Sequence, residues 1–570
     1  MTAVNAPVGG NPPAVARVDA RAIVIALTAL AALLRLYGLG QQSFWSDEMH
    51  TVMMAGVPYG PEAPPWRPSD LLQVTQGPFF MGLVHAWSRV AGRSEAALRL
   101  LPALFAIATV PMFFRLADRW IGRGGAILGT LVLAVSPFHI WYAQELRGYS
   151  LVIWAAVASA LALVLVLDAG GVRAHLRYGA SVLLGLGGSL TMGFLLPVHG
   201  LLAAVEARRR GLRPLLGLVL TWVLIGLCAL PWLGVFGTRH DVGRVVDRPA
   251  VEEPPLRGAT TMPALAIPYT FYAFALGFSY GPTPAELHQG PGAAARHHWP
   301  AIATAGVLFG GLALWGLQTL FRKKPRVAWM LLLWIAIPIL IAGWMAAANV
   351  KVWNARYVAV AFPAFLLLVG GGLCALPARL RRIGLALVLG LSGIAIWNLR
   401  TDPRYAKEDY RSAGSYLDRE LQPDDLLIGI GAPQPIFYYA VRRPSAYLLL
   451  HPHRIGDDQE LRRRIAAGAA GRSRVWLLRA RAHQSDPRNQ VGRILGETRN
   501  RAAHLAFTGI ELERYDQEPV PDRAGTPPAA RAQSCPSFAT LHVRPLRPLH
   551  AKRLPAARRS THPPEPNRSP

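Results

Sequence analysis

Long apolar runs, separated by short polar segments, dominate the first 400 residues of the chain. Because a helix needs about 20 mostly apolar residues to cross a hydrocarbon core of roughly 30 Å, these runs predict membrane-spanning helices. A sliding-window reading gives about eleven of them. They begin near Ala22, Leu100, Gly124, Leu151, Tyr178, Gly193, Pro214, Pro300, Ala328, Ala355 and Ile383. The runs near Tyr178 and Gly193 are short.

Basic residues cluster in the loops that follow every second run. Lys and Arg near span ends favour the cytoplasmic side, so these clusters predict the orientation. The clusters contain Arg115, Arg119 and Arg123; Arg173 and Arg177; Arg208, Arg209, Arg210 and Arg213; Arg322, Lys323, Lys324 and Arg326; Arg379, Arg381 and Arg382. The loops after Gly40, Tyr142, Phe236 and Ala348, and everything beyond Asn398, are then expected to face outward.

Two further apolar segments would break this alternation if they crossed the membrane. We expect "GPFFMGLVHAWSRVAG" to form an amphipathic helix on the outer surface. Its lipid-facing side chains would be Phe79, Phe80, Leu83 and Trp87. The stretch from Pro263 to Tyr280 is expected to be interfacial or re-entrant.

The pattern changes beyond Thr401, where helical and strand-like segments alternate. "DYRSAGSYLDREL" predicts an amphipathic helix, and "DLLIGIG", "SAYLLL" and "SRVWLLRA" predict buried strands. The sequence therefore predicts a cytoplasmic segment 1–21, an all-α polytopic membrane domain 22–400 with an outward first loop 40–98, and a small extracytoplasmic α/β domain 401–515. The basic, Pro/Arg-rich tail 516–570 is expected to be disordered.

Composition agrees with a membrane protein. The chain is 52% hydrophobic and only 16% charged, which is too apolar for a soluble domain of 570 residues. Its net charge of +27 would suit a nucleic-acid partner. The basic residues, however, lie between apolar runs and in the tail, so the charge indicates topology and membrane lipids rather than nucleic acid. Three Cys residues cannot form a disulfide framework.

Three polar clusters fall on the predicted outer side. "QQSFWSDEMHTV" contributes Asp47 and Glu48, "WYAQELRGYS" contributes Glu145 and Arg147, and "NVKVWNARYVAV" contributes Lys351, Arg356 and Tyr357. Arg or Lys binds a lipid-linked phosphate, whereas a carboxylate orients or deprotonates a nucleophile. Structural alternatives remain open, because Glu145 and Arg147 could pair with each other and the acids of the first loop could simply be solvated. Lys351 and Arg356 could extend toward headgroups.

An ordered series of motifs resembles the bacterial glycosyltransferase family 39 proteins of the C-type superfamily, together with the protein O-mannosyltransferases and the aminoarabinose transferases. The series runs from "RLYGLGQQSFWSDEMHT" through "WYAQELRGYSL" and "NARYVAVAFPAFLLLVGGGL" to "KEDYRSAGSYLDRELQPDDLLI". The resemblance implies an inverting enzyme of the bacterial cytoplasmic (inner) membrane. Such an enzyme moves a sugar from a polyprenyl-phosphate donor to a protein, lipid or glycan acceptor on the extracytoplasmic face.

By position, the resemblance implies that Asp47 is the base, with Glu48 beside it and Glu145 as the acid of the second loop. It places the donor phosphate near Arg147, Arg356 and Tyr357, with Lys351 and Arg99 as further candidates. The usual His-Pro-Pro run of the first loop is replaced by Gln76, Gly77 and Pro78.

Two questions stay open at the level of the sequence. A divalent metal is a candidate cofactor, with the adjacent His297 and His298 as candidate ligands, although adjacent histidines at the start of a span are more often interfacial. A glycolipid transporter or flippase, or a non-catalytic binder of lipid-linked sugar, is the alternative function. Transporters usually show internal repeats with broken helices at the bilayer midplane, and we find no such repeat in the sequence.

Overall fold

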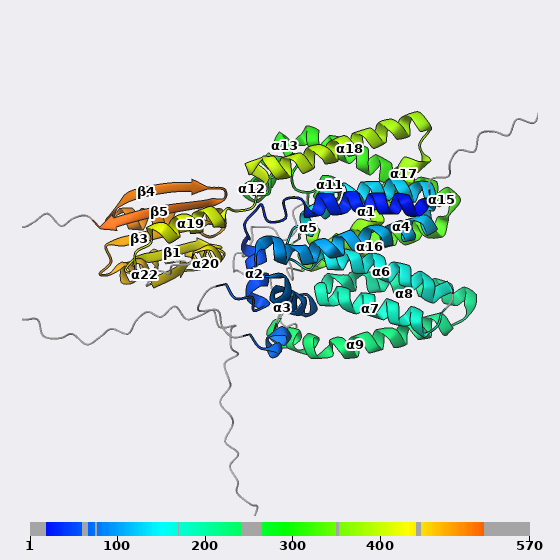
Figure 1. Cartoon of the computed structure of the whole chain (residues 1–570), viewed down its shortest axis with the longest axis horizontal. Helices are drawn as coiled ribbons and strands as arrows, with labels where there is room; N and C mark the ends of the chain where they lie inside the picture. Colours follow the sequence, from blue (N-terminus) through cyan, green and yellow to red (C-terminus); the bar gives the residue numbers. More distant parts are fainter. Residues whose placement is uncertain are drawn as a thin grey trace, which may run out of the picture.

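A bundle of long helices carries a separate sheet domain at one end (Figure 1). The computed structural model describes residues 19–59, 66–73, 77–168, 170–240, 265–348, 353–440, 446–455 and 457–517. The predicted phosphate ligand Lys351 and almost all of the basic tail lie outside these residues. We call the end of the bundle next to the sheet domain, where α2 (Ser46–Met54) and α3 (Pro78–Ala91) lie, the domain-facing end.

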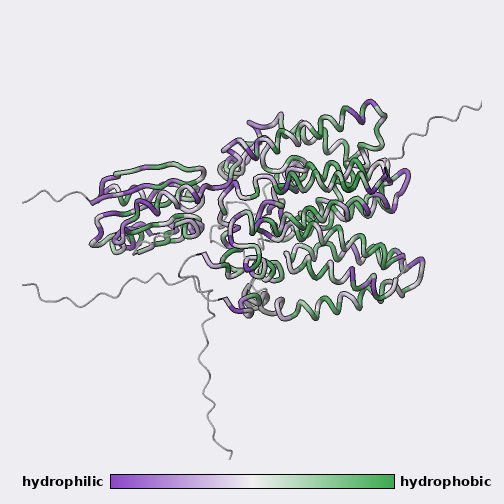
Figure 2. Tube along the Cα trace, in the orientation of Figure 1, coloured by the Kyte–Doolittle hydropathy of each residue, from purple (hydrophilic) through white to green (hydrophobic). Residues whose placement is uncertain are grey.

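Apolar residues run along the whole length of the bundle (Figure 2). Eight helical segments among the described residues are long and apolar enough to cross a membrane. The helices of the bundle are α1 (Ala20–Leu36), α4 (Glu95–Ala134), α6 (Tyr149–Asp168), α7 (Val172–Gly188), α8 (Leu196–Arg210), α9 (Arg213–His240), α14 (Trp299–Ala305), α15 (Gly311–Lys323), α16 (Pro325–Ala347), α17 (Phe362–Ala375) and α18 (Ala378–Thr401). Short elements η2 (Leu190–Leu195), η3 (Gly306–Gly310) and η4 (Ala355–Ala361) extend α8, α15 and α17. The protein is therefore a multi-pass membrane protein.

Helix α4 is a hairpin of two helices. Gly122 has φ 79° and ψ 168°, which no helical residue adopts. In one straight helix Phe113 and Gly129 would lie about 24 Å apart, whereas a Cβ at Gly129 would lie 3.5 Å from the Phe113 ring. The hairpin supplies the two runs expected near Leu100 and Gly124. Helices α1 and α7, of 17 residues each, lie at the runs expected near Ala22 and Tyr178.

The segments that were expected not to cross the membrane are both short helices. Helix α3 is present, but Phe80 is only 1% exposed and packs among first-loop residues such as Phe44. The expectation that Phe80 faces lipid was wrong, because this side of α3 packs on the first loop and α4; Phe79 is exposed. The segment 263–280 contains α11 (Ala266–Leu276), which is buried against α5 (Pro137–Ala143) and α18, as the re-entrant alternative requires.

The sheet domain is five-stranded, with strand order β2-β1-β3-β5-β4. Strands β1 (Leu426–Gly431), β2 (Ala446–Leu450) and β3 (Arg474–Ala480) are parallel and coincide with the three expected strand segments. Strands β4 (Arg499–Phe507) and β5 (Ile510–Gln517) form an antiparallel hairpin that the sequence analysis did not identify. Helices α19 (Tyr410–Glu420), α20 (Ile436–Tyr439), α22 (Asp458–Ala469) and α24 (Gln490–Gly496) accompany the sheet. The α/β class of this domain is confirmed.

Hydrogen bonds join the sheet domain to the first loop. The Tyr439 hydroxyl accepts from the Phe44 backbone N–H at 2.6 Å and donates to Glu95 Oε1 at 2.9 Å. Arg411 Nη2 donates to the same carboxylate oxygen at 2.6 Å. The domain is thus held directly against the segment that leads into α2.

Candidate active site at the domain-facing end

Helix α2 presents its two acids in its first turn. Carboxylates are favoured at a helix N-terminus because the unpaired backbone N–H groups there carry partial positive charge. Consecutive side chains on a helix point in different directions, so Asp47 and Glu48 meet different surroundings.

Glu48 is completely buried and accepts hydrogen bonds from four donors. Its Oε1 accepts from Arg99 Nε at 2.7 Å and from the Leu146 backbone N–H at 2.8 Å. Its Oε2 accepts from Arg99 Nη2 at 2.6 Å and from Lys407 Nζ at 3.1 Å. Burial by itself would raise the pKa of Glu48, but Arg99 and Lys407 outweigh it and lower the pKa to about 2. This carboxylate is ionised and saturated with donors.

Arg99 is equally saturated. Besides Glu48, its guanidinium donates to the backbone carbonyls of Leu39, Gln42 and Ser43 at 3.2, 2.6 and 3.0 Å. A guanidinium has five N–H groups, and these contacts use all of them. We therefore revise its candidate role as a phosphate ligand: Arg99 holds the first loop and Glu48 in place.

Lys407 is a site residue that the sequence analysis missed. It follows the membrane domain in the linker to α19, and its side chain is only 6% exposed. Besides Glu48, its ammonium donates to the Gln144 carbonyl at 3.4 Å and faces the Trp45 and Trp141 rings. The available signal was its position at the start of the motif "KEDYRSAGSYL".

Asp47 lies at the edge of this buried cluster. Its carboxylate forms an ion pair with Arg356 of η4, and its backbone carbonyl accepts from Arg147 Nη1 at 3.1 Å. The side chains of Asp47 and Arg356 remain 17% and 11% exposed. Burial would raise the pKa of Asp47, but Arg356, Arg147 and Arg481 hold it well below its usual range. The fold thereby brings together residues from three predicted polar clusters: Asp47, Arg147 and Arg356.

Glu145 is as buried as Glu48 but has few donors. Its Oε2 accepts from the Trp141 indole N–H at 2.9 Å, while its buried Oε1 has no hydrogen-bond partner among the described residues. Burial raises the pKa of Glu145; Lys407 opposes this, and the negative charges of Glu48 and Asp47 add to it. Glu145 is thus bound by Trp141, and the alternative that it pairs with Arg147 does not describe this structure.

The sheet domain contributes Arg481 to the same site. Arg481 follows β3 with φ 53°, a left-handed conformation that is uncommon outside glycine. Its guanidinium pairs with Glu408 and lies 4.8 Å from the centre of the Trp45 ring, two residues from Asp47. Arg481 is a second site residue that the sequence analysis missed, because nothing local marks it.

The remaining candidates lie in different places. Tyr357 is partly buried, and the Arg356 guanidinium lies 5.4 Å from the centre of its ring. His298 Nε2 lies 3.2 Å from Glu286 Oε2, at the start of α14, and His297 is exposed. In the described part of the chain, the one group of side chains placed to share a metal ion is His504, Glu511 and Glu513 in the β4–β5 hairpin. Since the carboxylates at α2 face arginines and Lys407, the donor set there does not fit a divalent ion.

Comparison with solved structures identifies the fold. The chain is similar to ArnT from Cupriavidus metallidurans in the apo state, with 14% identity and a TM-score of 0.55 over 87% of this chain and 98% of that chain. A structure of the same ArnT bound to undecaprenyl phosphate matches with 13% identity and a TM-score of 0.53 over the same shares. Neither the scan against protein-family models nor the search of curated proteins found a match. The chain has the C-type glycosyltransferase fold that the motifs implied.

Proposed function

We propose that the protein transfers a sugar, with inversion, from a polyprenyl-phosphate donor to a hydroxyl or amine of a protein, lipid or glycan acceptor. The reaction would take place at the extracytoplasmic face of the cytoplasmic (inner) membrane. The observation that carries the proposal is the contact between Asp47 and Arg356 at the domain-facing end of the bundle. It places a candidate base beside a candidate phosphate ligand. The shared fold with an ArnT that binds undecaprenyl phosphate supports the donor class.

In this proposal Arg356 and Arg147 bind the donor phosphate. A guanidinium binds two oxygens of a phosphate at once. Arg356 lies in η4, just before α17 begins at the domain-facing end of the bundle, where a lipid-linked phosphate could reach it. When the bond between the sugar and the phosphate breaks, negative charge grows on the leaving phosphate. Fixed cations in a partly dry site stabilise that charge without reorganisation. Lys351, close in sequence to Arg356, remains a further candidate ligand.

The ion pair also suggests how donor binding would activate the base. A carboxylate whose pKa lies far below the working pH accepts protons poorly, and Arg356 is the cation that lowers the pKa of Asp47 most. A donor phosphate that draws Arg356 away would raise the pKa of Asp47. Asp47 would then orient and deprotonate the acceptor, which attacks the anomeric carbon, while Glu145 offers its unpartnered oxygen to a hydroxyl of the sugar or the acceptor.

The direct test is Asp47→Asn in the purified full chain, supplied with polyprenyl-phosphate sugars and extracts that contain candidate acceptors. General-base catalysis typically contributes 10²–10⁴-fold, so we expect transfer to fall by about that factor while expression and thermal unfolding stay unchanged. Asp70→Asn is the matched control. Asp70 lies in the same loop, in η1 (Pro68–Gln73), and among the described residues its carboxylate accepts from the Arg67 backbone N–H alone.

Transfer by Asp47→Asn at the wild-type rate would contradict the assigned base. Movement of an intact lipid-linked sugar across vesicles by the wild-type protein, without formation of a glycosylated product, would instead support the transporter alternative. Mass spectrometry of glycolipids and glycoproteins from cells with and without the protein would identify the sugar and the acceptor.

A further inference from the structure

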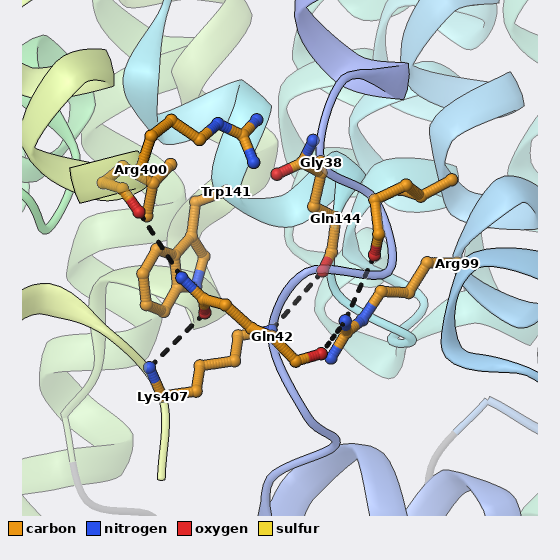
Figure 3. Close-up of a pocket in the computed structure, with 9 residues that line it drawn as sticks. Gly38, Gln42, Arg99, Trp141, Gln144, Arg400 and Lys407 are labelled. Atoms are coloured by element: carbon orange, nitrogen blue, oxygen red, sulfur yellow. Dashed lines mark hydrogen bonds between the residues drawn. The ribbon is translucent and has the colours of Figure 1, made fainter. Parts of the chain in front are cut away.

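A small pocket lies where α1, α5 and α18 end, at the domain-facing end of the bundle (Figure 3). Its walls include Gly38 and Gln42 after α1, Trp141 of α5, Arg400 in the last turn of α18, and Lys407 of the linker. Neither Asp47 nor Arg356 lines it. The pocket therefore adjoins the candidate active site through Lys407 and Trp141, which contact Glu48 and Glu145, but it does not include the ion pair on which the proposed function rests.

The walls of the pocket carry positive charge and no carboxylate. Arg99, Arg400 and Lys407 line it, whereas Asp and Glu are absent from its lining. Glu48 pairs with Arg99 and Lys407. Arg400, in contrast, has no carboxylate partner within the part of the chain that the structure describes. An anion is the ligand that this arrangement would accept.

Arg400 uses little of its hydrogen-bonding capacity. Its Nη2 donates to the Leu34 carbonyl at 3.3 Å, and its guanidinium lies 5.6 Å from the centre of the Tyr37 ring. Its Nε is buried and makes no hydrogen bond to any described residue. A guanidinium has five N–H groups, so several of them remain available to a ligand.

Gly38 makes room for this guanidinium. It has φ 68°, and a Cβ at this position would lie 2.8 Å from Arg400 Nη1. Figure 3 shows the head of Arg400 directed toward Gly38. Both the backbone conformation and the close approach favour glycine here.

We propose that this pocket binds the phosphate of a membrane lipid headgroup, with Arg400 as its main ligand and Lys407 as a second one. Arg400 is in the last turn of α18, a helix long and apolar enough to cross a membrane. A long basic side chain at such a helix end can reach headgroup phosphates, and Arg matches the geometry of phosphate oxygens. Lys407 Nζ donates to Glu48 and Gln144, which leaves one of its three N–H groups for a ligand. The Trp141 ring and Leu399 provide apolar walls beside the charges.

The test uses the detergent-purified full chain and dioctanoyl phosphatidic acid as the probe, with binding followed by tryptophan fluorescence. Losing one charge-assisted contact of about 1.5 kcal/mol weakens binding about tenfold, which is the change we expect for Arg400→Gln. Gly38→Ala keeps the charge but displaces the guanidinium, and it should also weaken binding. Arg404→Gln is the matched control, because Arg404 is a nearby exposed arginine that pairs with Asp402. It should bind as the wild type does.

Equal affinity of Arg400→Gln and the wild type would overturn the proposal, provided that their thermal unfolding agrees. Inorganic phosphate that binds as tightly as the lipid would show that the pocket holds a free anion, and this too would overturn the assignment to a lipid. Dioctanoylglycerol, which lacks the phosphate, should not bind. Arg356→Gln, which removes the proposed ligand of the donor phosphate, should bind the probe as the wild type does, so a failure of this proposal and a failure of the proposed function are distinguishable.

Discussion

The buried cluster around Glu48 and the edge of the site around Asp47 begin at neighbouring residues of α2 but have opposite character. Glu48 is completely buried, and four donors from Arg99, Leu146 and Lys407 satisfy its carboxylate. Asp47 keeps 17% of its side chain exposed and forms an ion pair with Arg356. A group whose hydrogen-bonding capacity is fully used stabilises the fold. A group that is accessible and has hydrogen-bonding capacity left can bind a substrate. The adjacent acids Asp47 and Glu48 therefore divide into one accessible carboxylate and one carboxylate that is saturated with donors.

Glu48 and Glu145 also differ in how many donors their carboxylates have. Both are buried, but Glu145 keeps one oxygen without a partner in the described structure, and its pKa is raised where that of Glu48 is lowered. The number of cationic donors, rather than burial, decides the charge state of each acid.

The largest expected effect comes from removing the saturated acid. Glu48→Ala leaves Arg99 and Lys407 buried without their shared carboxylate, and breaking a buried ion pair in this way costs ~3–5 kcal/mol. We expect a strongly lowered midpoint of thermal unfolding, measured by tryptophan fluorescence in detergent. Glu145→Gln is the matched control, since it removes an equally buried acid whose ionisation is disfavoured. It should be at least as stable as the wild type at neutral pH.

The pH dependence of stability sharpens this prediction. The pKa of Glu48 is about 2 in the folded protein and 4.5 ordinarily, so its contribution is complete above pH 4.5 and is lost as the pH falls toward 2. Glu48→Gln should lack this part of the acid-induced loss. An unchanged acid profile, or a Glu48→Ala variant as stable as the wild type, would contradict the structural role.

The next effect concerns the edge of the site. Arg356→Gln removes the cation proposed to stabilise the leaving phosphate, and the loss of one such donor costs about 2.7–4 kcal/mol, or 10²–10³ in kcat. Stability should change far less than in Glu48→Ala. Arg356→Lys, which retains the charge but not the paired donors, should recover part of the rate.

Arg326→Gln, in α16 at the opposite end of the bundle, is the control for Arg356 and should transfer sugar normally. Arg356→Gln could instead lower stability as much as Glu48→Ala and leave kcat intact. That result would contradict the distinction between a structural cluster around Glu48 and a chemical site around Asp47.

The smallest effect tests the contribution of the sheet domain. Arg481 helps to lower the pKa of Asp47, so Arg481→Gln should raise that pKa and move the acid limb of the rate profile to higher pH. A partly exposed charge contact is worth ~0.2–1 kcal/mol, which corresponds to a change in rate of about 1.4- to fivefold on that limb. Arg479→Gln, which affects an ion pair with Glu511 in the same domain, should leave the profile unchanged. Identical profiles for both variants would exclude Arg481 from the site.

Most of the membrane architecture was predictable because it depends on local sequence. The length of an apolar run decides whether it can cross a bilayer, and the runs near Leu100 and Gly124 correspond to the two limbs of the α4 hairpin. The strands "DLLIGIG" and "SRVWLLRA" were recognisable for the same reason, since they are short and continuously apolar. The β4–β5 hairpin was missed because β4, "RNRAAHLAF", is largely exposed and too polar to show a buried face, and because β5, "IELERYDQ", is rich in charged residues although half of its side chains are buried.

The site was only partly predictable. Asp47, Glu145, Arg147 and Arg356 were recognised from their residue types at the ends of spans and from the family resemblance. Their contacts were not, because Arg356 meets Asp47 across 309 positions of sequence and Lys407 meets Glu48 across 359. The tertiary structure also changed the role of Arg99 from a phosphate ligand to a support.

The sequence by itself determined the helical membrane domain, the class of the sheet domain and the residue types available for chemistry, since hydrophobic length and side-chain type act locally. Only the tertiary structure decided which acid is saturated and which is accessible. That difference depends on how many cationic donors distant segments bring to each carboxylate. The segments α2, α4, η4, the linker and the sheet domain meet only when the chain folds. Burial and charge pairing are properties of that assembly, and no single segment encodes them.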